Sequence, residues 1–176
     1  MDLCFFSLSS GSSGNSYYLG SPTRGILIDA GISATSVRRH LKSFGIEIEA
    51  VAGILVTHNH SDHIRGLEIL TRRYSLPAYT SEGVRRSILG PCKKISAAAI
   101  RQIPLLSSFN VGGFEVEAFP VCHDAPETIG FHICAGKRKI TIATDLGHIC
   151  ETAASYIRAA DILVLESNYD RQMLDE

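Results

Sequence analysis

Short apolar runs alternate along the chain with segments whose apolar positions follow a helical period. Continuous apolar runs bounded by turn residues predict buried strands, and the alternation of Phe114, Val116 and Ala118 with charged residues predicts a half-buried one. A turn at 135–137 predicts a hairpin there. The strands are expected at residues 3–8, 16–19, 25–30, 51–57, 77–80, 114–119, 129–134, 139–143 and 162–165.

Helices are predicted at four places between these strands. Residues 33–44 place Val37, Leu41 and Phe44 on one face, and residues 151–160 form a second helical segment. Two more helices are expected to follow polar caps, one after Ser61 or Asp62 with Ile64, Leu67 and Leu70 on its apolar face, and one at 81–89 capped by Ser81. Buried strands mixed with helices indicate α/β architecture, with sheets covered by helices in one domain, 1–176.

Composition narrows the class of protein. The chain has 176 residues, 45% hydrophobic and 20% charged, which excludes a disordered tail, a fibre and a coiled coil. No apolar run reaches the roughly 20 residues of a membrane-spanning helix, and the first residues do not resemble a secretory signal. Five cysteines without a CxxC pair favour reduced thiols. We therefore expect a cytoplasmic protein without a membrane partner.

The net charge of −1 conceals an uneven distribution. Residues 38–101 contain 11 Lys or Arg against 5 Asp or Glu, a local charge of +6, and the rest of the chain carries −7. Much of the positive charge lies in pairs such as Arg72-Arg73 and Arg85-Arg86. This asymmetry indicates either an anionic partner or solvated helix faces unrelated to function.

The strongest chemical signal is the segment His58-Asn59-His60-Ser61-Asp62-His63, which holds three of the seven histidines. On an extended segment, His58 and His60 project to the same side and can bind one cation together. Asp62 and His63 follow where a helix begins, so they point elsewhere and can bind a second cation. Imidazole and carboxylate together suit Zn²⁺ and its first-row neighbours.

Two further residues lie at strand ends. His123 follows the apolar run 119–122, and Asp145 follows the run 140–144. Alone, each would more often be structural. Because a strand end holds a side chain rigidly while leaving it accessible, both become candidate ligands beside the histidine cluster.

These residues resemble a known family. The pattern His58-x-His60-x-Asp62-His63, followed by His123 and Asp145, is similar to the metallo-β-lactamase fold, an αββα sandwich. The segments 10–16, 57–63, 121–125, 144–148 and 166–170 are similar to the YycJ/WalJ group of bacterial cytoplasmic proteins, regarded as metal-dependent DNA exonucleases.

The resemblance implies a site with two divalent ions, Zn²⁺ or Mn²⁺, with Fe²⁺ also possible. It implies that Asp29 supports the metal loop through hydrogen bonds and that Asn168 lines the substrate cleft. His148 is either a supporting or phosphate-contacting residue, or a capping or surface histidine. The implied ligands are His58, His60 and His123 for the first ion and Asp62 and His63 for the second, with Asp145 bridging both.

The resemblance also bears on the length of the chain. Family members supply one more histidine to the second ion, whereas no histidine follows His148 here. We therefore expect the C-terminal part of the domain to be missing and the second site to lack one ligand.

The expected function is hydrolysis of DNA, in the 5'-to-3' direction by resemblance, with Asp62 and Asp145 as catalytic residues. Two ions about 3.5–4 Å apart lower the pKa of bound water, and the hydroxide attacks a phosphodiester. Two alternatives stay open: a hydrolase of small esters or thioesters, and a metal-binding or regulatory module without turnover. The loop 9–14 either presents its N–H groups to a phosphate or is an ordinary turn. The sequence does not indicate the oligomeric state.

Overall fold

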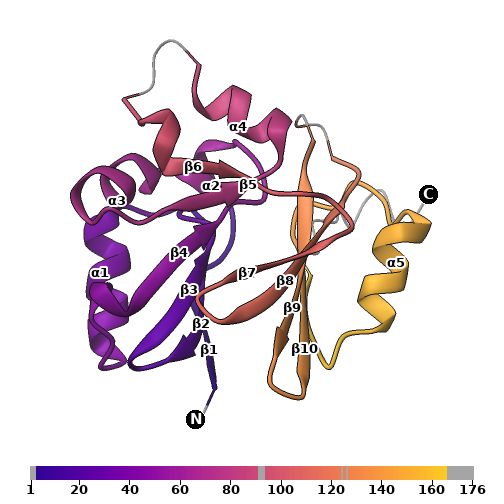
Figure 1. The fold of residues 1–176 in the computed structure, drawn as a ribbon, viewed down its shortest axis with the longest axis horizontal. Coiled ribbons are helices and arrows are strands. Elements are labelled where there is room, and N and C mark those ends of the chain that lie inside the picture. The colour runs from indigo at the N-terminus through magenta and orange to yellow at the C-terminus, as the bar shows by residue number, and fades with distance from the viewer. Residues whose placement is uncertain (1–2, 91–93, 124, 126, 166–176) are drawn as a thin grey trace.

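Two β-sheets face each other, and helices cover both outer surfaces (Figure 1). The computed structural model describes residues 3–90, 94–123, 125 and 127–165. The layers follow the order helix, sheet, sheet, helix, which confirms the predicted αββα sandwich.

The first sheet has six strands in the order β1-β2-β3-β4-β5-β6. β1 to β3 pair antiparallel, and β3 to β6 pair parallel. Helical crossovers join the parallel strands, as this pairing requires. The strands are β1 (Cys4–Ser9), β2 (Ser16–Ser21), β3 (Arg24–Ile28), β4 (Val51–Leu55), β5 (Ala78–Thr80) and β6 (Ile100–Gln102).

The second sheet has five strands in the order β11-β10-β9-β8-β7. Its pairs are antiparallel except for β10 and β11, which are parallel and connected through a helix. The strands are β7 (Ser108–Val111), β8 (Phe114–Pro120), β9 (Ile129–Ala135), β10 (Arg138–Ala143) and β11 (Ile162–Leu165).

The helices complete the outer layers. In Figure 1, α1 and α3 lie outside the first sheet and α5 lies outside the second. In the described part of the chain, no helix is long and apolar enough to cross a membrane. The α-helices are α1 (Ala34–Ser43), α2 (Ser61–Ile64), α3 (Leu67–Arg73), α4 (Glu82–Ile88) and α5 (Glu151–Arg158), and two 3-10 turns are η1 (Ile48–Ala50) and η2 (Ala97–Ala99).

Three apolar clusters hold the four layers together. In β2, Tyr18 packs toward the helices of the first sheet, while Leu19 packs between the sheets. In β4, Ile54 and Leu55 divide in the same way. A third, smaller cluster around Phe119 joins the second sheet to α5. Strands buried on both faces explain the continuous apolar runs in the sequence.

The helix expected after Ser61 differs from the prediction in two respects. His60 is its N-cap, without a side-chain capping hydrogen bond, so neither Ser61 nor Asp62 caps it. The helix also divides at Gly66 into α2 and α3. The N–H of Gly66 donates to Ala30 O at 2.8 Å, and a Cβ there would overlap the carbonyl oxygen of Ile32. Contact with the chain after β3 therefore divides the helix.

The sequence pattern does not indicate β6 and β7. Each has only three or four residues, and most of their side chains are not buried. Gly112 and Gly113 both have positive φ and connect β7 to β8 in a two-residue hairpin turn. This Gly-Gly pair beside alternating residues is the signal that would have identified β7.

We expect Leu70→Ala to lower the free energy of unfolding by about 2–5 kcal/mol, because Leu70 on α3 is fully buried. Its neighbour Ile69 is 45% exposed, so Ile69→Ala is a matched control with an effect within about 0.5 kcal/mol. Denaturant unfolding measures both, and equal effects would contradict the assigned helix face.

Candidate metal centre

Both sheets contribute side chains to one cluster of histidines and carboxylates. His58 and His60 lie in the segment between β4 and α2, and His63 lies within α2. His123 follows β8 and Asp145 follows β10 in the second sheet. The cluster therefore forms where strand ends of the two sheets meet.

Three histidines form the first group of donor atoms. One ring nitrogen from each of His58, His60 and His123 lies within 4.8 Å of the others. The ring of His58 lies 4.7 Å from that of His60 and 5.1 Å from that of His123 between centroids. Residues separated by 65 positions in the sequence thus surround a common point.

A second group shares His58 with the first. His58, His63 and Asp145 offer donor atoms that lie within 4.8 Å of one another. His63 Nε2 lies 3.1 Å from Asp145 Oδ2 and 3.6 Å from Asp62 Oδ2. Asp62 lies at the edge of this group without belonging to either compact set among the described residues.

The side chain of Asp29 forms hydrogen bonds to the histidine segment. Its carboxylate accepts hydrogen bonds from Thr57 N at 2.9 Å, Thr57 Oγ1 at 2.8 Å and His63 Nδ1 at 2.8 Å. Both Asp29 and Asp145 have φ of 56°, in the left-handed region. Such backbone conformations cost about 1–3 kcal/mol and concentrate at functional sites.

The hydrogen bonds of His58 leave one ring nitrogen available to a cation. Thr57 Oγ1 donates its proton to Asp29, so at 3.0 Å it accepts from His58 Nδ1. Nε2 of His58 therefore carries a lone pair. That atom is buried and has no hydrogen-bond partner among the described residues. A buried acceptor without a donor is unfavourable unless a cation binds it.

Electrostatics in the cluster also favour a positive charge. Burial and the nearby His63 lower the pKa of His58 to about 4, so His58 is neutral and can bind a metal. Burial alone would lower the pKa of His63, but the charge of Asp29 and hydrogen bonds to Asp145 and Asp29 raise it to about 10. Burial alone would raise the pKa of Asp145, but the hydrogen bond to His63 lowers it to about 2. Without a metal, a proton on His63 supplies the charge.

The donor set fits divalent metal ions. Ligands about 2.0–2.1 Å from a tetrahedral zinc lie about 3.4 Å apart, close to the 3.1 Å between His63 Nε2 and Asp145 Oδ2. Imidazole with carboxylate is a typical set for first-row metals. In each group, donor atoms from the histidine segment lie within 4.8 Å of one from the second sheet.

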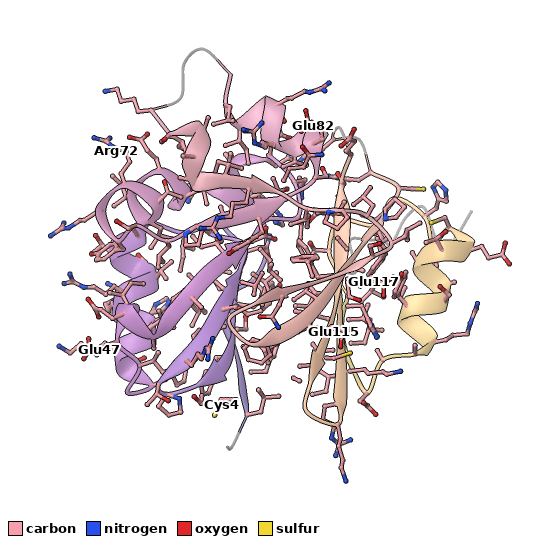
Figure 2. All side chains as sticks on the ribbon, viewed as in Figure 1. Cys4, Glu47, Arg72, Glu82, Glu115 and Glu117 are labelled. Carbon is pink, nitrogen blue, oxygen red and sulfur yellow. The ribbon has the colours of Figure 1, made fainter. Side chains whose placement is uncertain are left out.

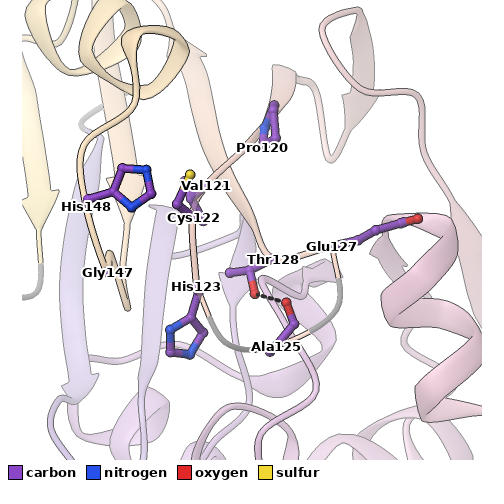
Figure 3. A pocket seen from close by; sticks show the side chains of 9 residues that line it. All are labelled: Pro120, Val121, Cys122, His123, Ala125, Glu127, Thr128, Gly147 and His148. Carbon is purple, nitrogen blue, oxygen red and sulfur yellow. Dashed lines mark hydrogen bonds between the residues drawn. The ribbon is translucent and has the colours of Figure 1, made fainter.

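His148 and Asn168 are the remaining predicted site residues. His148 faces Cys122 through an isolated backbone bridge and lines a groove of about 680 Å³ together with His123. Figure 3 shows both histidines beside this groove. Asn168 lies outside the described residues.

Sequence reasoning missed Asn15. Its side-chain nitrogen lies 3.1 Å from His63 Nε2, and the residue is 2% exposed. An asparagine after a Gly/Ser loop has no local pattern that indicates this contact, since the partners are 48 positions apart.

The fold defines the class of protein. The chain superposes on a metallo-β-lactamase mutant (S60) from Cronobacter sakazakii with a TM-score of 0.71 and 17% identity, over 92% of this chain and 74% of that one. The architecture is therefore the metallo-β-lactamase fold. The model of the beta-lactamase superfamily domain matches residues 24–175. The chain belongs to this superfamily.

Two relatives are similar over nearly the whole chain. The Bacillus anthracis protein named exodeoxyribonuclease YycJ is 37% identical over 99% of this chain. The Streptococcus pneumoniae protein named exodeoxyribonuclease WalJ is 30% identical over 95% of it. The matches cover 66% and 63% of those relatives, so the chain spans just under two thirds of their length.

We expect Gly31→Ala to disrupt the site, because a Cβ at Gly31 would overlap the carbonyl oxygen of Asp62. The free energy of unfolding should fall by about 3 kcal/mol. Gly90→Ala is the control, since within the described part of the chain its Cβ would meet Ser87 O at 3.5 Å and nothing nearer, with an expected effect within about 0.5 kcal/mol. Thermal unfolding measures both. A Gly31→Ala protein as stable as the parent would contradict this close backbone contact.

Proposed function

We propose that this protein is a metal-dependent exodeoxyribonuclease with two adjacent divalent ions. The observation that supports the proposal is the pair of donor groups that share His58. His58, His60 and His123 hold the first ion. His63 and Asp62 would hold the second, and Asp145 would supply a ligand to both. The ligand set accepts Zn²⁺, Mn²⁺ or Fe²⁺.

Each residue of the site has a defined task in this proposal. Bound divalent ions supply Lewis-acid charge and make water nucleophilic near neutral pH. Asp62, whose side chain is 28% exposed, reaches the solvent side and accepts a proton from the attacking water. Asp145 orients both halves of the site, and Asp29 fixes His63 through Nδ1. The chain's own groups thus bind, orient and accept a proton.

DNA as the substrate is supported by relatives and by charge. Both relatives carry the name exodeoxyribonuclease. The basic segment 38–101 supplies the helices beside the first sheet, whereas Glu115 and Glu117 lie on the second (Figure 2). Exposed Arg65 follows α2 directly, next to the metal cluster. This segment would attract a polyanion with a salt-dependent affinity. By resemblance, we propose 5'-to-3' degradation.

The arginine pairs contribute unequally to that attraction. Arg72 and Arg86 form ion pairs with Glu68 and Glu82, one turn earlier on their own helices. Arg85 donates to the carbonyl of Ile100. Arg65 also donates to a backbone carbonyl, that of Ser13 at 3.0 Å, but it is exposed and is the basic residue nearest to Asp62 and His63 in sequence, so we assign it to strand binding beside the site.

The groove beside His123 is the proposed path of the strand. Its walls come from the segment after β8 and from Gly147 and His148. We assign His148 to a phosphate contact, since it lines the same groove as His123. Asn168 stays a proposed substrate contact.

The test is DNA degradation by the purified chain with Mn²⁺ or Zn²⁺, using oligonucleotides labelled at either end. We expect His60→Ala and Asp62→Ala to lower the rate at least about 100-fold while the protein stays folded. His40→Ala on α1 is the matched control and should leave the rate unchanged. Because the match covers 66% of the B. anthracis relative, that full-length relative is assayed alongside the chain.

Three results would contradict the proposal. Normal turnover by Asp62→Ala would show that Asp62 is not the proton acceptor. Hydrolysis of small esters or thioesters without DNA degradation, and without salt dependence, would favour the ester hydrolase. Metal binding without any hydrolysis, in both the chain and the full-length relative, would favour a metal-binding module.

A further inference from the structure

Two cysteines come together beside the second sheet, although the sequence contains no CxxC pair. Cys122 follows β8, and Cys150 is the N-cap of α5. Both are free and half-buried. The side chain of Cys150 makes no capping hydrogen bond to α5, and its thiol interacts instead with the thiol of Cys122. The function proposed above uses neither thiol.

The path of the backbone explains why the two thiols meet. Cys122 and His148 form an isolated antiparallel bridge, and Gly147 N donates to Cys122 O at 2.8 Å. Side chains directly opposite each other in such a pair project to the same side, and so does the residue two positions further along. Cys150 occupies that position and is the diagonal neighbour of Cys122. The contact therefore follows from how the chain runs between β10 and α5.

A small oxidant can reach this pair of thiols. Cys122 lines the groove of about 680 Å³ beside His123 (Figure 3). The other described cysteines lie elsewhere. Cys4 is in β1 of the first sheet, and Cys134 in β9 pairs with Glu115, at the opposite end of β8 from Cys122. Among the described cysteines, this pair is therefore the one placed to react internally.

We propose that hydrogen peroxide converts Cys122 and Cys150 to a disulfide and that this modification weakens metal binding by His123. One thiol takes up an oxygen atom from the peroxide as a sulfenic acid, and one water leaves. The second thiol attacks that sulfur, so the S–S bond forms and a second water leaves. The two thiols thus supply the two electrons that reduce the O–O bond, and a dithiol reverses the reaction by exchange.

The disulfide acts on His123 because bond formation requires movement. Diagonal neighbours in an antiparallel pair lie about 7–8 Å apart between Cα atoms, whereas a disulfide spans about 4.4–6.8 Å, so closure takes a shift of about 1–2 Å. Two hydrogen bonds hold α5 on the second sheet: Tyr156 Oη donates to Glu117 Oε1, and Thr141 Oγ1 donates to Tyr156 O at 3.0 Å. The movement therefore falls on Cys122 and on His123, the next residue. This effect rests on the proposed function, whereas the disulfide itself does not.

The first experiment treats the metal-free chain with equimolar hydrogen peroxide, alkylates the remaining thiols and maps the peptides by mass spectrometry. We expect the alkylated thiols to fall from five to three, with one peptide pair joined through Cys122 and Cys150. Cys122→Ser and Cys150→Ser should each abolish that product, and the matched control Cys134→Ser should retain it. No disulfide, a disulfide between other cysteines, or one between two chains would overturn the proposal. Mapping of the parent chain alone gives this answer if a variant does not fold.

The second experiment measures Zn²⁺ binding to the reduced and the oxidised chain through the ring ¹⁵N resonances of His123. We expect the apparent affinity to fall at least about tenfold on oxidation, as for other changes that misplace a metal ligand, and dithiothreitol to restore it. Cys122→Ser is the matched control, because the residue beside His123 can then no longer be oxidised, and its affinity should be equal before and after peroxide.

The outcomes separate this proposal from the proposed function. If the disulfide forms but His123 of the reduced chain does not respond to Zn²⁺, the first ion is absent, and the proposed function and the effect on His123 both fail. If His123 binds Zn²⁺ and no disulfide forms, the redox pair alone fails. Equal Zn²⁺ affinity in the reduced and oxidised chains would overturn the link between the thiols and the metal centre.

Discussion

The buried carboxylate of Asp29 accepts three hydrogen bonds, and these join the end of β3 to the histidine segment that follows β4. Two of the donors belong to Thr57 and the third to His63, so one carboxylate fixes both the start and the end of the segment. Thr57 in turn fixes the ring of His58. His63 therefore depends on Asp29 directly, and His58 depends on it through Thr57.

The second sheet supplies the other proposed ligands of the cluster. His123 and Asp145 each join a donor group that contains His58, and they do so from strands that pair with their own sheet. The apolar contacts between the sheets, and the hydrogen bond from Ile129 N to Thr57 O at 3.1 Å, therefore set the distance between ligands from the two halves. The cluster brings a carboxylate within 3.1 Å of an imidazole nitrogen, an arrangement that needs a positive charge between them. A proton supplies that charge in the metal-free protein, and divalent ions supply it in the proposed enzyme.

Strand ends and the histidine segment could be predicted from the sequence because both depend on local patterns. Buried apolar runs ending in His58, His123 and Asp145 identified the residues that the fold brings together. Asn15 could not be predicted in this way, since its contact with His63 depends on how two distant loops pack. The division of the helix at Gly66 also depends on tertiary contact, here with Ala30 and Ile32. Asp62 lies at the edge of the cluster, a position that periodicity alone does not specify.

In the proposed enzyme, two neighbouring ions occupy the donor groups that share His58. Anomalous X-ray diffraction at the zinc edge, on crystals of the chain loaded with Zn²⁺, would locate them, with metal content measured on the same sample. We predict two peaks, one among His58, His60 and His123 and the other beside His63 and Asp145. A single peak, or no metal at either position, would contradict the account.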